Sequence, residues 1–360
     1  MTETRPLPAG ATIGILGGGQ LGRMLSVAAS RLGLRCHIFE PGAAPAADVA
    51  AVVTQASYDD TAALDSFARA VDVVTFEFEN VPARSLDRIE ALVPIRPNRR
   101  ALAISQDRLE EKTFLKGLGL NTAPFAPVDT GDDLERALAD LGCPAILKTR
   151  RLGYDGKGQV RLRAADQTAE AIAAMAGAPA LLEGWVDFSM EISVIAARGL
   201  SGEVACFDPG ANLHDGGILR RTTVPAPIPA SLRTDAILLA GRILNALDYV
   251  GVLGVELFVT PQGLVVNEIA PRVHNSGHWT QNGCVVDQFE QHIRAIAGWP
   301  LGDGRRHADV VMENLIGDDM DRVPALATTP NLALHLYGKA EVRPGRKMGH
   351  VNHVTPLPLP

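Results

Sequence analysis

Apolar runs of strand length alternate with helical patterns along the first hundred residues. Residues 11–16 (ATIGIL) form an apolar run that ends in glycines, and residues 20–33 carry apolar side chains at helical spacing. Further strand-like runs follow at residues 35–41 and 71–80. Strands that alternate with helices favour a parallel sheet with helices on its faces. We therefore expect a Rossmann-like α/β domain over residues 1–100.

The pattern changes after this domain. A helix is predicted over residues 101–118, and the strand-like runs that follow are interrupted by helical stretches at residues 164–176 and 231–247. Antiparallel strands mixed with helices favour an α+β domain of two lobes over residues 101–300. A small C-terminal domain is predicted over residues 301–360.

A hairpin in the second region places two glutamates on one face. A turn at Pro261, Gln262 and Gly263 would pair Thr260 with Leu264, Phe258 with Val266, and Glu256 with Glu268. Side chains alternate along a strand, so both carboxylates point the same way. Directly opposed carboxylates repel, and a divalent cation between them would turn repulsion into binding. Magnesium suits this pair, because it accepts one or two carboxylates and fills its other positions with water and phosphate oxygens. A solvated strand end, or a register shifted by one residue, is the alternative.

A cationic, glycine-rich segment follows the apolar run CPAIL. Residues 148–158 (KTRRLGYDGKG) contain four cations and three glycines. Lys148 at a strand end could reach inner phosphates as a point charge. The glycines would let the loop close over a polyphosphate and donate backbone N–H groups. A surface hairpin with solvated charges is the alternative interpretation.

A second glycine motif lies near the N-terminus. Gly17, Gly19 and Gly22 fit G-x-G-x-x-G between a strand and a helix, and Glu40 closes the next strand. This spacing is typical of dinucleotide binding, so an NAD-dependent oxidoreductase has to be considered. The unit is short for a complete cofactor domain, however. The same turn could serve packing alone, or bind one phosphorylated ligand.

Composition narrows the classes of partner. The 360 residues are 46% hydrophobic and 21% charged, with a formal net charge of −7. This charge argues against a nucleic-acid partner. The four cysteines are far apart and form no CxxC, which argues against zinc or a disulfide framework. No stretch reaches the roughly 18 apolar residues of a membrane span, and the N-terminus lacks a signal-peptide pattern. We expect a cytoplasmic protein with no membrane partner.

Several motifs together resemble a known family. Lys148, the glycine-rich loop, EGWV at residues 183–186 and the Glu256/Glu268 pair resemble ATP-grasp enzymes, in which ATP lies between two α+β lobes. The order GGGQLGRM, TFEFENVP, GYDGKGQ, NLHDGGILR, NEIAPRVHNSGHWTQN and RPGRKMGH is similar to the 5-(carboxyamino)imidazole ribonucleotide synthases of purine biosynthesis. The similarity covers nearly the whole chain.

This resemblance implies a reaction. ATP phosphorylates bicarbonate to carboxyphosphate, and the exocyclic amine of 5-aminoimidazole ribonucleotide captures the carboxyl group, with release of ADP and phosphate. The resemblance also implies magnesium as cofactor, held by Glu256 and Glu268, and a homodimer. Members are expected to continue beyond Pro360 through another helix and strand.

The resemblance carries over site residues one at a time. Phosphate contacts, a lid, a backbone contact to adenine and a ribose contact from Glu191 are implied for ATP. The implied ATP-binding residues are Arg108, Lys148, Gly153, Tyr154, Asp155, Gly156, Lys157, Gly158, Gln159, Glu183, Gly184, Trp185, Val186, Glu191, His214, Asn267 and Glu268. Taken alone, Arg108 and Glu191 would more simply be surface ion pairs.

A second set is expected to recognise the aminoimidazole ribonucleotide. It consists of Glu77, Tyr154, Lys157, Arg272, His274, Asn275, Ser276, Lys339 and Arg346. Asp155 is the acid expected to assist proton removal from the amine, with Lys339 as its electrostatic partner. Arg272 would stabilise carboxyphosphate or the substrate phosphate. His274 and His278 have the spacing of a helical zinc motif, but the residues between them favour a loop and a substrate pocket.

Other functions stay open on these grounds. Another ATP-grasp enzyme, such as biotin carboxylase or the formate-dependent glycinamide ribonucleotide transformylase, would share the lid and the glutamate pair. A nicotinamide oxidoreductase would leave that pair unexplained. A non-catalytic nucleotide sensor would keep Lys148 and the interdomain hinge at residues 183–186. It would need neither both glutamates nor Asp155.

Overall fold

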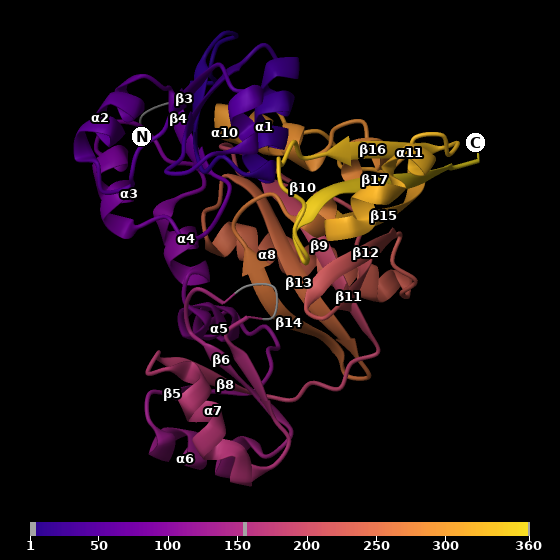
Figure 1. Cartoon of the computed structure of the whole chain (residues 1–360). Coiled ribbons are helices and arrows are strands. Elements are labelled where there is room, and N and C mark those ends of the chain that lie inside the picture. The colour runs from indigo at the N-terminus through magenta and orange to yellow at the C-terminus, as the bar shows by residue number, and fades with distance from the viewer. Residues whose placement is uncertain (1–4, 154–156, 359–360) are drawn as a thin grey trace.

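Three sheets organise the described part of the chain. The computed structural model describes residues 5–153 and 157–358. Within these ranges two sheets have four strands each, and a third has nine. Figure 1 shows the N-terminal domain at the top, the small lobe at the bottom and the large sheet between them, with its C-terminal strands in yellow. The predicted fold class, with its N-terminal, ATP-grasp and C-terminal parts, is confirmed. The predicted boundaries stay predictions.

The N-terminal domain has the expected parallel sheet. Its strands lie in the order β3-β2-β1-β4, and the three neighbouring pairs are parallel. The elements are β1 (Thr12–Leu16), α1 (Gln20–Arg31), β2 (Arg35–Phe39), β3 (Val52–Thr54), α2 (Thr61–Arg69), β4 (Val73–Phe76) and α3 (Ala83–Glu90). Strand β4 is shorter than the predicted strand over residues 71–80, so Glu77 and Glu79 lie beyond its end.

The single helix predicted over residues 101–118 is wrong. The structure has two helices there, α4 (Arg99–Ser105) and α5 (Arg108–Gly117). Asp107 separates them, because its carboxylate accepts the backbone N–H of Leu109 and caps the start of α5. The same carboxylate accepts two hydrogen bonds from Arg150, at 3.0 and 2.8 Å. The start of α5 is thereby tied to the segment after Lys148.

The small lobe is an antiparallel sheet covered by two helices. The strand order is β5-β8-β6-β7. Its elements are β5 (Phe125–Val128), α6 (Gly131–Leu141), β6 (Ala145–Thr149), β7 (Gln159–Leu162), α7 (Thr168–Met175) and β8 (Ala180–Gly184). Strands β6 and β7 form a hairpin, and the glycine-rich segment is its connection.

The large lobe and the C-terminal region share one sheet. The order is β14-β13-β9-β11-β12-β15-β17-β16, with β10 beside β9. The strands are β9 (Met190–Arg198), β10 (Val204–Cys206), β11 (Gly210–Asp215), β12 (Ile218–Val224), β13 (Gly251–Thr260), β14 (Gly263–Ala270), β15 (Ala308–Ile316), β16 (Leu332–Leu336) and β17 (Lys347–Pro356). The accompanying helices are α8 (Ala230–Ala246), α9 (Thr280–Gly283), α10 (Gln288–Ala297) and α11 (Val323–Leu326).

One core joins the N-terminal domain to the large lobe. It contains Ile13 and Leu25 from the first and Val252, Phe289 and Val310 from the second. His292 of α10 adds a polar link, because its Nδ1 accepts the Val252 N–H at 3.0 Å and its Nε2 lies 2.8 Å from the Thr75 hydroxyl. Burial lowers the pKa of His292 to about 3, so the ring stays neutral.

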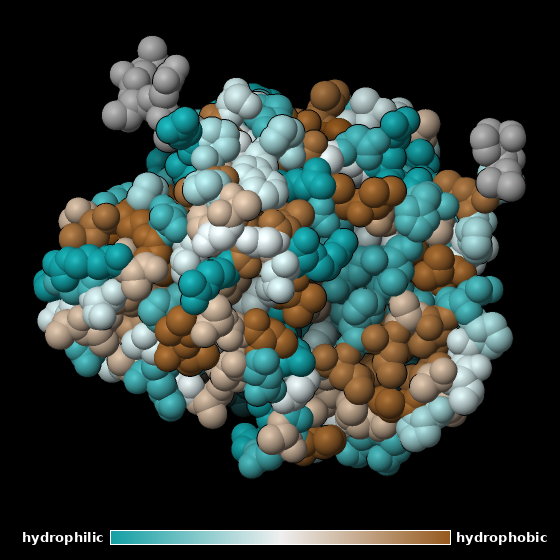
Figure 2. Space-filling view, turned by 90° about the horizontal axis from the view of Figure 1, so that it is seen from above, coloured by the Kyte–Doolittle hydropathy of each residue, from teal (hydrophilic) through white to brown (hydrophobic). Residues whose placement is uncertain are grey.

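The surface is mixed in polarity. Figure 2 shows hydrophilic residues and smaller hydrophobic patches interspersed over the face seen from above. Among the described residues, no helix has both the length and the apolar composition needed to cross a membrane.

Candidate active site

One cavity is lined by the N-terminal domain, by the predicted lid (residues 153–159) and by the large lobe. Its volume is about 570 Å³. Its wall includes Glu77, Arg108, Gly153, Lys157, Gln159, Glu191, His214, Glu256, Asn267, Glu268, Arg272, His274 and Asn275, which are residues that the sequence singled out. Residues that are some 200 positions apart in the chain therefore face the same space.

The glutamate pair faces this cavity from the hairpin of β13 and β14. Glu256 and Glu268 are opposite one another, as predicted. The register used to predict this pairing was nevertheless wrong, because Thr260 pairs with Gly263 and Phe258 with Val265. A bulge between Glu256 and Leu257 shifts the register by one residue and restores the glutamate pair.

The pair carries uneven charge. Burial, followed by the negative charge of Glu268, raises the pKa of Glu256 to about 7. Burial would also raise the pKa of Glu268, but the positive charges of Arg108 and Lys148 lower it overall. The Arg108 guanidinium lies 3.3 Å from the Glu268 carboxylate. Glu268 is thus the more stable anion of the two.

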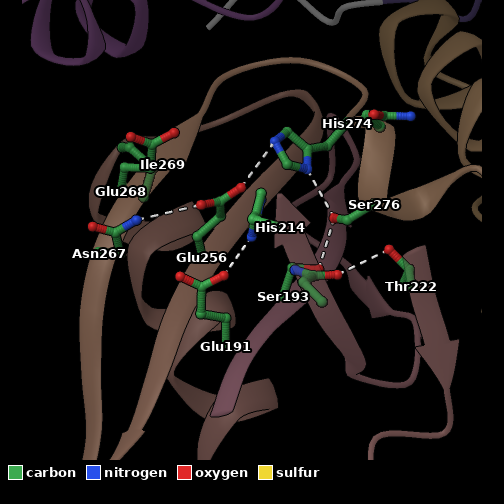
Figure 3. A network of polar contacts seen from close by, with 12 residues as sticks. Glu191, Ser193, His214, Thr222, Glu256, Asn267, Glu268, Ile269, His274 and Ser276 are labelled. Atoms are coloured by element: carbon green, nitrogen blue, oxygen red, sulfur yellow. Dashed lines mark hydrogen bonds and ion pairs between the residues drawn. The ribbon is translucent and has the colours of Figure 1, made fainter. Parts of the chain in front are cut away.

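A polar chain supports Glu256 from behind (Figure 3). Ser193 donates its hydroxyl proton to Ser276 at 2.7 Å, and the Ser276 oxygen lies 2.8 Å from Nδ1 of His274. Nε2 of His274 lies 3.4 Å from the Glu256 carboxylate. Burial lowers the pKa of His274 well below its usual value, so the neutral ring can accept from Ser276 and donate to Glu256. Ser276 is fully buried behind His274, and it does not line the cavity.

Glu191 and His214 make a second polar contact on the same wall. Nδ1 of His214, on β11, contacts the carboxylate of Glu191, on β9 (Figure 3). Burial would lower the pKa of His214, but the hydrogen bond and the charge of Glu191 raise it overall. The His214 imidazolium can therefore neutralise Glu191 in the absence of a ligand.

Lys148, on strand β6 of the small lobe, is already paired. Its ammonium group is 2.9 Å from the Glu183 carboxylate, and the ammonium group of Lys112 is 3.6 Å from the same oxygen. Burial would raise the pKa of Glu183, but the two lysines lower it overall. Lys148 and Glu183 lie outside the cavity wall, so contact between Lys148 and a phosphate would need a change in this pairing.

The predicted adenine segment ends strand β8. The Gly184 N–H donates to the Pro124 carbonyl at 2.8 Å, and the Trp185 N–H donates to Pro144 at 3.2 Å. Both donors are engaged, so adenine would have to use other backbone groups of residues 183–186. The guanidinium of Arg161 lies 4.1 Å from the ring centroid of Trp185.

The lid begins and ends in contact with Thr149. The Thr149 N–H donates to the Gly158 carbonyl at 2.8 Å. Gly158 has φ +70°, and a Cβ there would lie 2.6 Å from the Thr149 hydroxyl oxygen, so this position requires glycine. Tyr154, Asp155 and Gly156 were predicted as ATP or substrate contacts, and they lie outside the described residues.

The N-terminal glycine motif holds a carboxylate of the chain itself. Glu77 accepts the N–H groups of Gly19 and Gly22 at the start of α1, the second at 2.5 Å. Glu40 accepts the Gly18 N–H at 2.8 Å. A Cβ at Gly19 would lie 2.6 Å from Glu77, which explains the glycine. The donors that a dinucleotide pyrophosphate would need are thus used by carboxylates, which speaks against the oxidoreductase alternative.

The expected cations of the substrate site have partners. Arg272 forms an ion pair with Glu79 at 2.6 Å, so Glu79 is not merely solvated. Lys339 donates to the Lys347 carbonyl at 2.6 Å, and burial lowers the pKa of Lys339 to about 8. Arg346 donates to the Glu341 carbonyl at 3.0 Å. Neither Lys339 nor Arg346 lines the cavity, whereas Lys347 does.

The donor set fits magnesium. The described residues contain no group of three or more His, Cys, Asp or Glu side chains placed to hold a metal ion. Magnesium needs fewer, because one or two carboxylates suffice when phosphate oxygens complete the shell. Glu256 and Glu268 supply two, and the Asn267 amide lies 3.3 Å from Glu256.

Sequence reasoning missed Glu111, Lys112 and the side-chain role of Glu183. Glu111 and Lys112 lie on α5 and are 3% and 1% exposed. They follow Arg108 by three and four residues, so the three side chains share one helical face. This spacing was the signal in the sequence that could have identified them.

Family models match three consecutive parts of the chain. They are the ribonucleotide synthetase preATP-grasp domain at residues 10–106, the ATP-grasp domain at residues 113–289 and the phosphoribosylaminoimidazole carboxylase C-terminal domain at residues 310–356.

Curated relatives match over nearly the full chain. An N5-carboxyaminoimidazole ribonucleotide synthase of Brucella melitensis is 55% identical over 97% of this chain and 98% of its own length. One of Pseudomonas aeruginosa is 45% identical over 94% of this chain and 93% of its own length.

Solved structures agree with these matches. An N5-carboxyaminoimidazole ribonucleotide synthetase in complex with ADP is 42% identical, with a TM-score of 0.95, over 98% of this chain and 94% of the other. The Aspergillus clavatus synthase in complex with ADP and 5-aminoimidazole ribonucleotide is 31% identical, with a TM-score of 0.91, over 97% and 94%.

Proposed function

The chain belongs to the N5-carboxyaminoimidazole ribonucleotide synthase family of ATP-grasp ligases, and we propose that it carboxylates 5-aminoimidazole ribonucleotide with ATP and bicarbonate. The products are N5-carboxyaminoimidazole ribonucleotide, ADP and phosphate. The supporting observation is that one cavity joins Glu77 of the N-terminal domain to the glutamate pair of the large lobe. A nucleotide and a small acceptor can therefore meet in one cavity.

The test is ADP release from magnesium-ATP and bicarbonate, with and without 5-aminoimidazole ribonucleotide. Glycinamide ribonucleotide with formate, and biotin, serve as control acceptors for the other ATP-grasp reactions. We expect stimulation by 5-aminoimidazole ribonucleotide alone. Stimulation by one of the controls instead would assign the chain to another acceptor.

ATP binding is proposed for the cavity between the lobes. Arg108 bridges this region, because it contacts Glu268 and also donates to the Gly153 carbonyl of the lid at 3.4 Å. Phosphate oxygens could replace these acceptors, since a guanidinium binds carboxylate and phosphate in the same way. Lys148 and the segment 157–159 would add charge and backbone donors, and Glu191 would accept from the ribose hydroxyls.

Magnesium is proposed at Glu256 and Glu268. When bound, it would neutralise phosphate charge during transfer. The two carboxylates are held in register by the bulge, and His274 and Asn267 orient Glu256 by hydrogen bonds. These partners limit the rotamers of Glu256 before any cation arrives.

Asp155 is proposed to accept a proton from the attacking amine. The proposal comes from the sequence, because this residue lies outside the described ranges. Burial lowers the pKa of its suggested partner Lys339 to about 8, so this lysine is largely protonated at pH 7. Asp155→Asn should lower turnover far more than ATP affinity. An equal loss in both quantities would contradict this role.

The substrate phosphate is proposed to lie near Lys339 and Arg346, with Arg272 and Asn275 closer to the reacting groups. Homodimer assembly and a cytoplasmic location are also proposed, supported by the family resemblance. Light scattering on the purified chain tests the first, and a mass of one chain would contradict it.

A further inference from the structure

Helix α5 (Arg108–Gly117) presents three charged side chains to strand β14. Arg108, Glu111 and Lys112 are three and four positions apart and therefore share one helical face. Arg108 contacts the carboxylate of Glu268 at 3.3 Å. The other two residues contact the backbone of β14.

These backbone contacts lie on both sides of Glu268. Glu111 accepts the N–H of Ile269 at 2.6 Å, and Lys112 donates to the carbonyl of Asn267 at 2.7 Å. Adjacent residues of one helix thus hold the two residues that flank Glu268. The side chain of Glu268 is free to point into the cavity, where Figure 3 shows it beside Asn267.

The edge position of β14 explains why such contacts are needed. Strand β14 is the last strand in the sheet order, so its outer edge has no neighbouring strand. The Val266 N–H donates to Asn121 at 2.8 Å, and beyond it the side chains of α5 supply the partners. Because the bulge leaves Asn267 without an opposite residue on β13, its carbonyl needs the partner that Lys112 provides.

Glu111 and Lys112 are unusual because charged side chains are seldom so deeply buried. Glu111 is 3% exposed and Lys112 is 1% exposed. Apolar residues would pack a helix against a sheet more easily than a buried carboxylate and ammonium group do. Lys112 lies behind the cavity wall, and Glu111 lines the wall. Each makes its hydrogen bond to a defined backbone group next to the same glutamate.

We propose that Glu111 and Lys112 are positioning residues that fix the backbone on both sides of Glu268 and so aim its carboxylate at the cation. The inference rests on the proposed function, because Glu268 has to be a magnesium ligand. It assigns Glu111 a role as a hydrogen-bond acceptor rather than as a charge.

Variants of Glu111 separate these roles. Glu111→Gln removes the charge and keeps an oxygen at the same reach, whereas Glu111→Asp keeps the charge and withdraws the oxygen by one methylene. Lys112→Met removes the donor to Asn267. Glu110→Gln and Lys116→Met are matched controls at exposed positions of the same helix.

The readout is Mn²⁺ binding in the presence of ADP, followed by the electron paramagnetic resonance signal of free Mn²⁺. We expect Glu111→Asp and Lys112→Met to weaken binding by about 10- to 100-fold, as for other residues that orient metal ligands. Glu111→Gln should stay within about threefold of the parent, and the controls should not change. Melting temperatures measured without metal identify any variant that does not fold. If Lys112→Met does not fold, Lys112→Gln replaces it.

The outcomes distinguish this inference from the proposal beneath it. If the parent binds no Mn²⁺ with ADP, the metal site itself is wrong, and the positioning role falls with it. If the parent binds and the Asp and Lys112 variants bind equally well, only the positioning role is overturned. If Glu111→Gln binds Mn²⁺ weakly while Glu111→Asp binds it normally, Glu111 acts through its charge, as a ligand. This outcome would also overturn the positioning role.

Discussion

Two groups of charged side chains lie near the candidate site, and their charge balance differs. On the small-lobe side, Glu183 has two lysine ammonium groups within 4 Å, Lys148 and Lys112. On the large-lobe side, Glu256 and Glu268 oppose each other across the hairpin, and burial raises the pKa of Glu256 to about 7. In the first group both ammonium groups already have a carboxylate partner without a ligand. In the second group two carboxylates oppose each other and Arg108 pairs with Glu268 alone, which is why we place the cation site there and expect a larger contribution to stability from the first.

The largest expected effect tests the large-lobe group. Glu268→Gln should lower the rate of ADP release with 5-aminoimidazole ribonucleotide by about 100- to 1,000-fold, because it removes a ligand for the cation that stabilises charge in the transition state. Steady-state kinetics at saturating Mg²⁺ measure this. The exposed Glu170→Gln is the control. A loss below tenfold would remove Glu268 from the metal site.

The next effect tests the small-lobe group. Glu183→Gln should lower the free energy of unfolding by about 3 kcal/mol, because two buried ammonium groups lose their counter-ion. Urea unfolding without metal or nucleotide measures the change. An unchanged midpoint would show that Lys112 and Lys148 find other partners, and that this group is not the stabilising one.

A pH series tests the electrostatics of the large-lobe group. Because the pKa of Glu256 is raised in the folded state, its contribution to stability is full below about pH 4.5 and is lost as the pH rises through about 7. Relative to Glu256→Gln, the metal-free parent should lose on the order of 3 kcal/mol over this range. Unfolding curves of both proteins from pH 4.5 to 8 measure the difference. Parallel stability profiles would contradict the raised pKa.

The smallest effect concerns the rim of the small lobe. Arg161 lies over the ring of the half-exposed Trp185 at 4.1 Å. Arg161→Ala should cost only about 0.5 kcal/mol, because a cation–π contact at an exposed site is weak. A loss comparable to that of Glu183→Gln would show that exposed charges also stabilise this lobe.

The sequence predicted the pairing of Glu256 with Glu268 correctly, but from a register that is wrong near the turn. Strand alternation correctly places Glu256 and Glu268 on one face, but the turn register was off by one residue and the bulge compensated for it. A bulge depends on pairing across the hairpin, so no local pattern announced it. The family resemblance and the parallel N-terminal sheet were predicted and are confirmed.

Long-range contacts could not be predicted from local patterns. The glycine motif left dinucleotide binding, a single phosphorylated ligand and packing alone open, and in the structure Glu77, 55 residues beyond Gly22, accepts from its N–H groups. The break between α4 and α5 was readable in principle, because Asp107 is a favoured N-cap residue. The assigned roles of the remaining site residues stay predictions.

The sheet shared by the large lobe and the C-terminal region has a consequence for ligand design. Strand β14, with Glu268, and strand β17, which begins at Lys347, belong to one hydrogen-bonded sheet, whereas the lid belongs to a separate one. The distance between Glu268 and Lys347, which both line the cavity, is therefore set by one sheet. A ligand that links an ATP-like group to an aminoimidazole ribonucleotide group would have to match this distance, whatever position the small lobe takes.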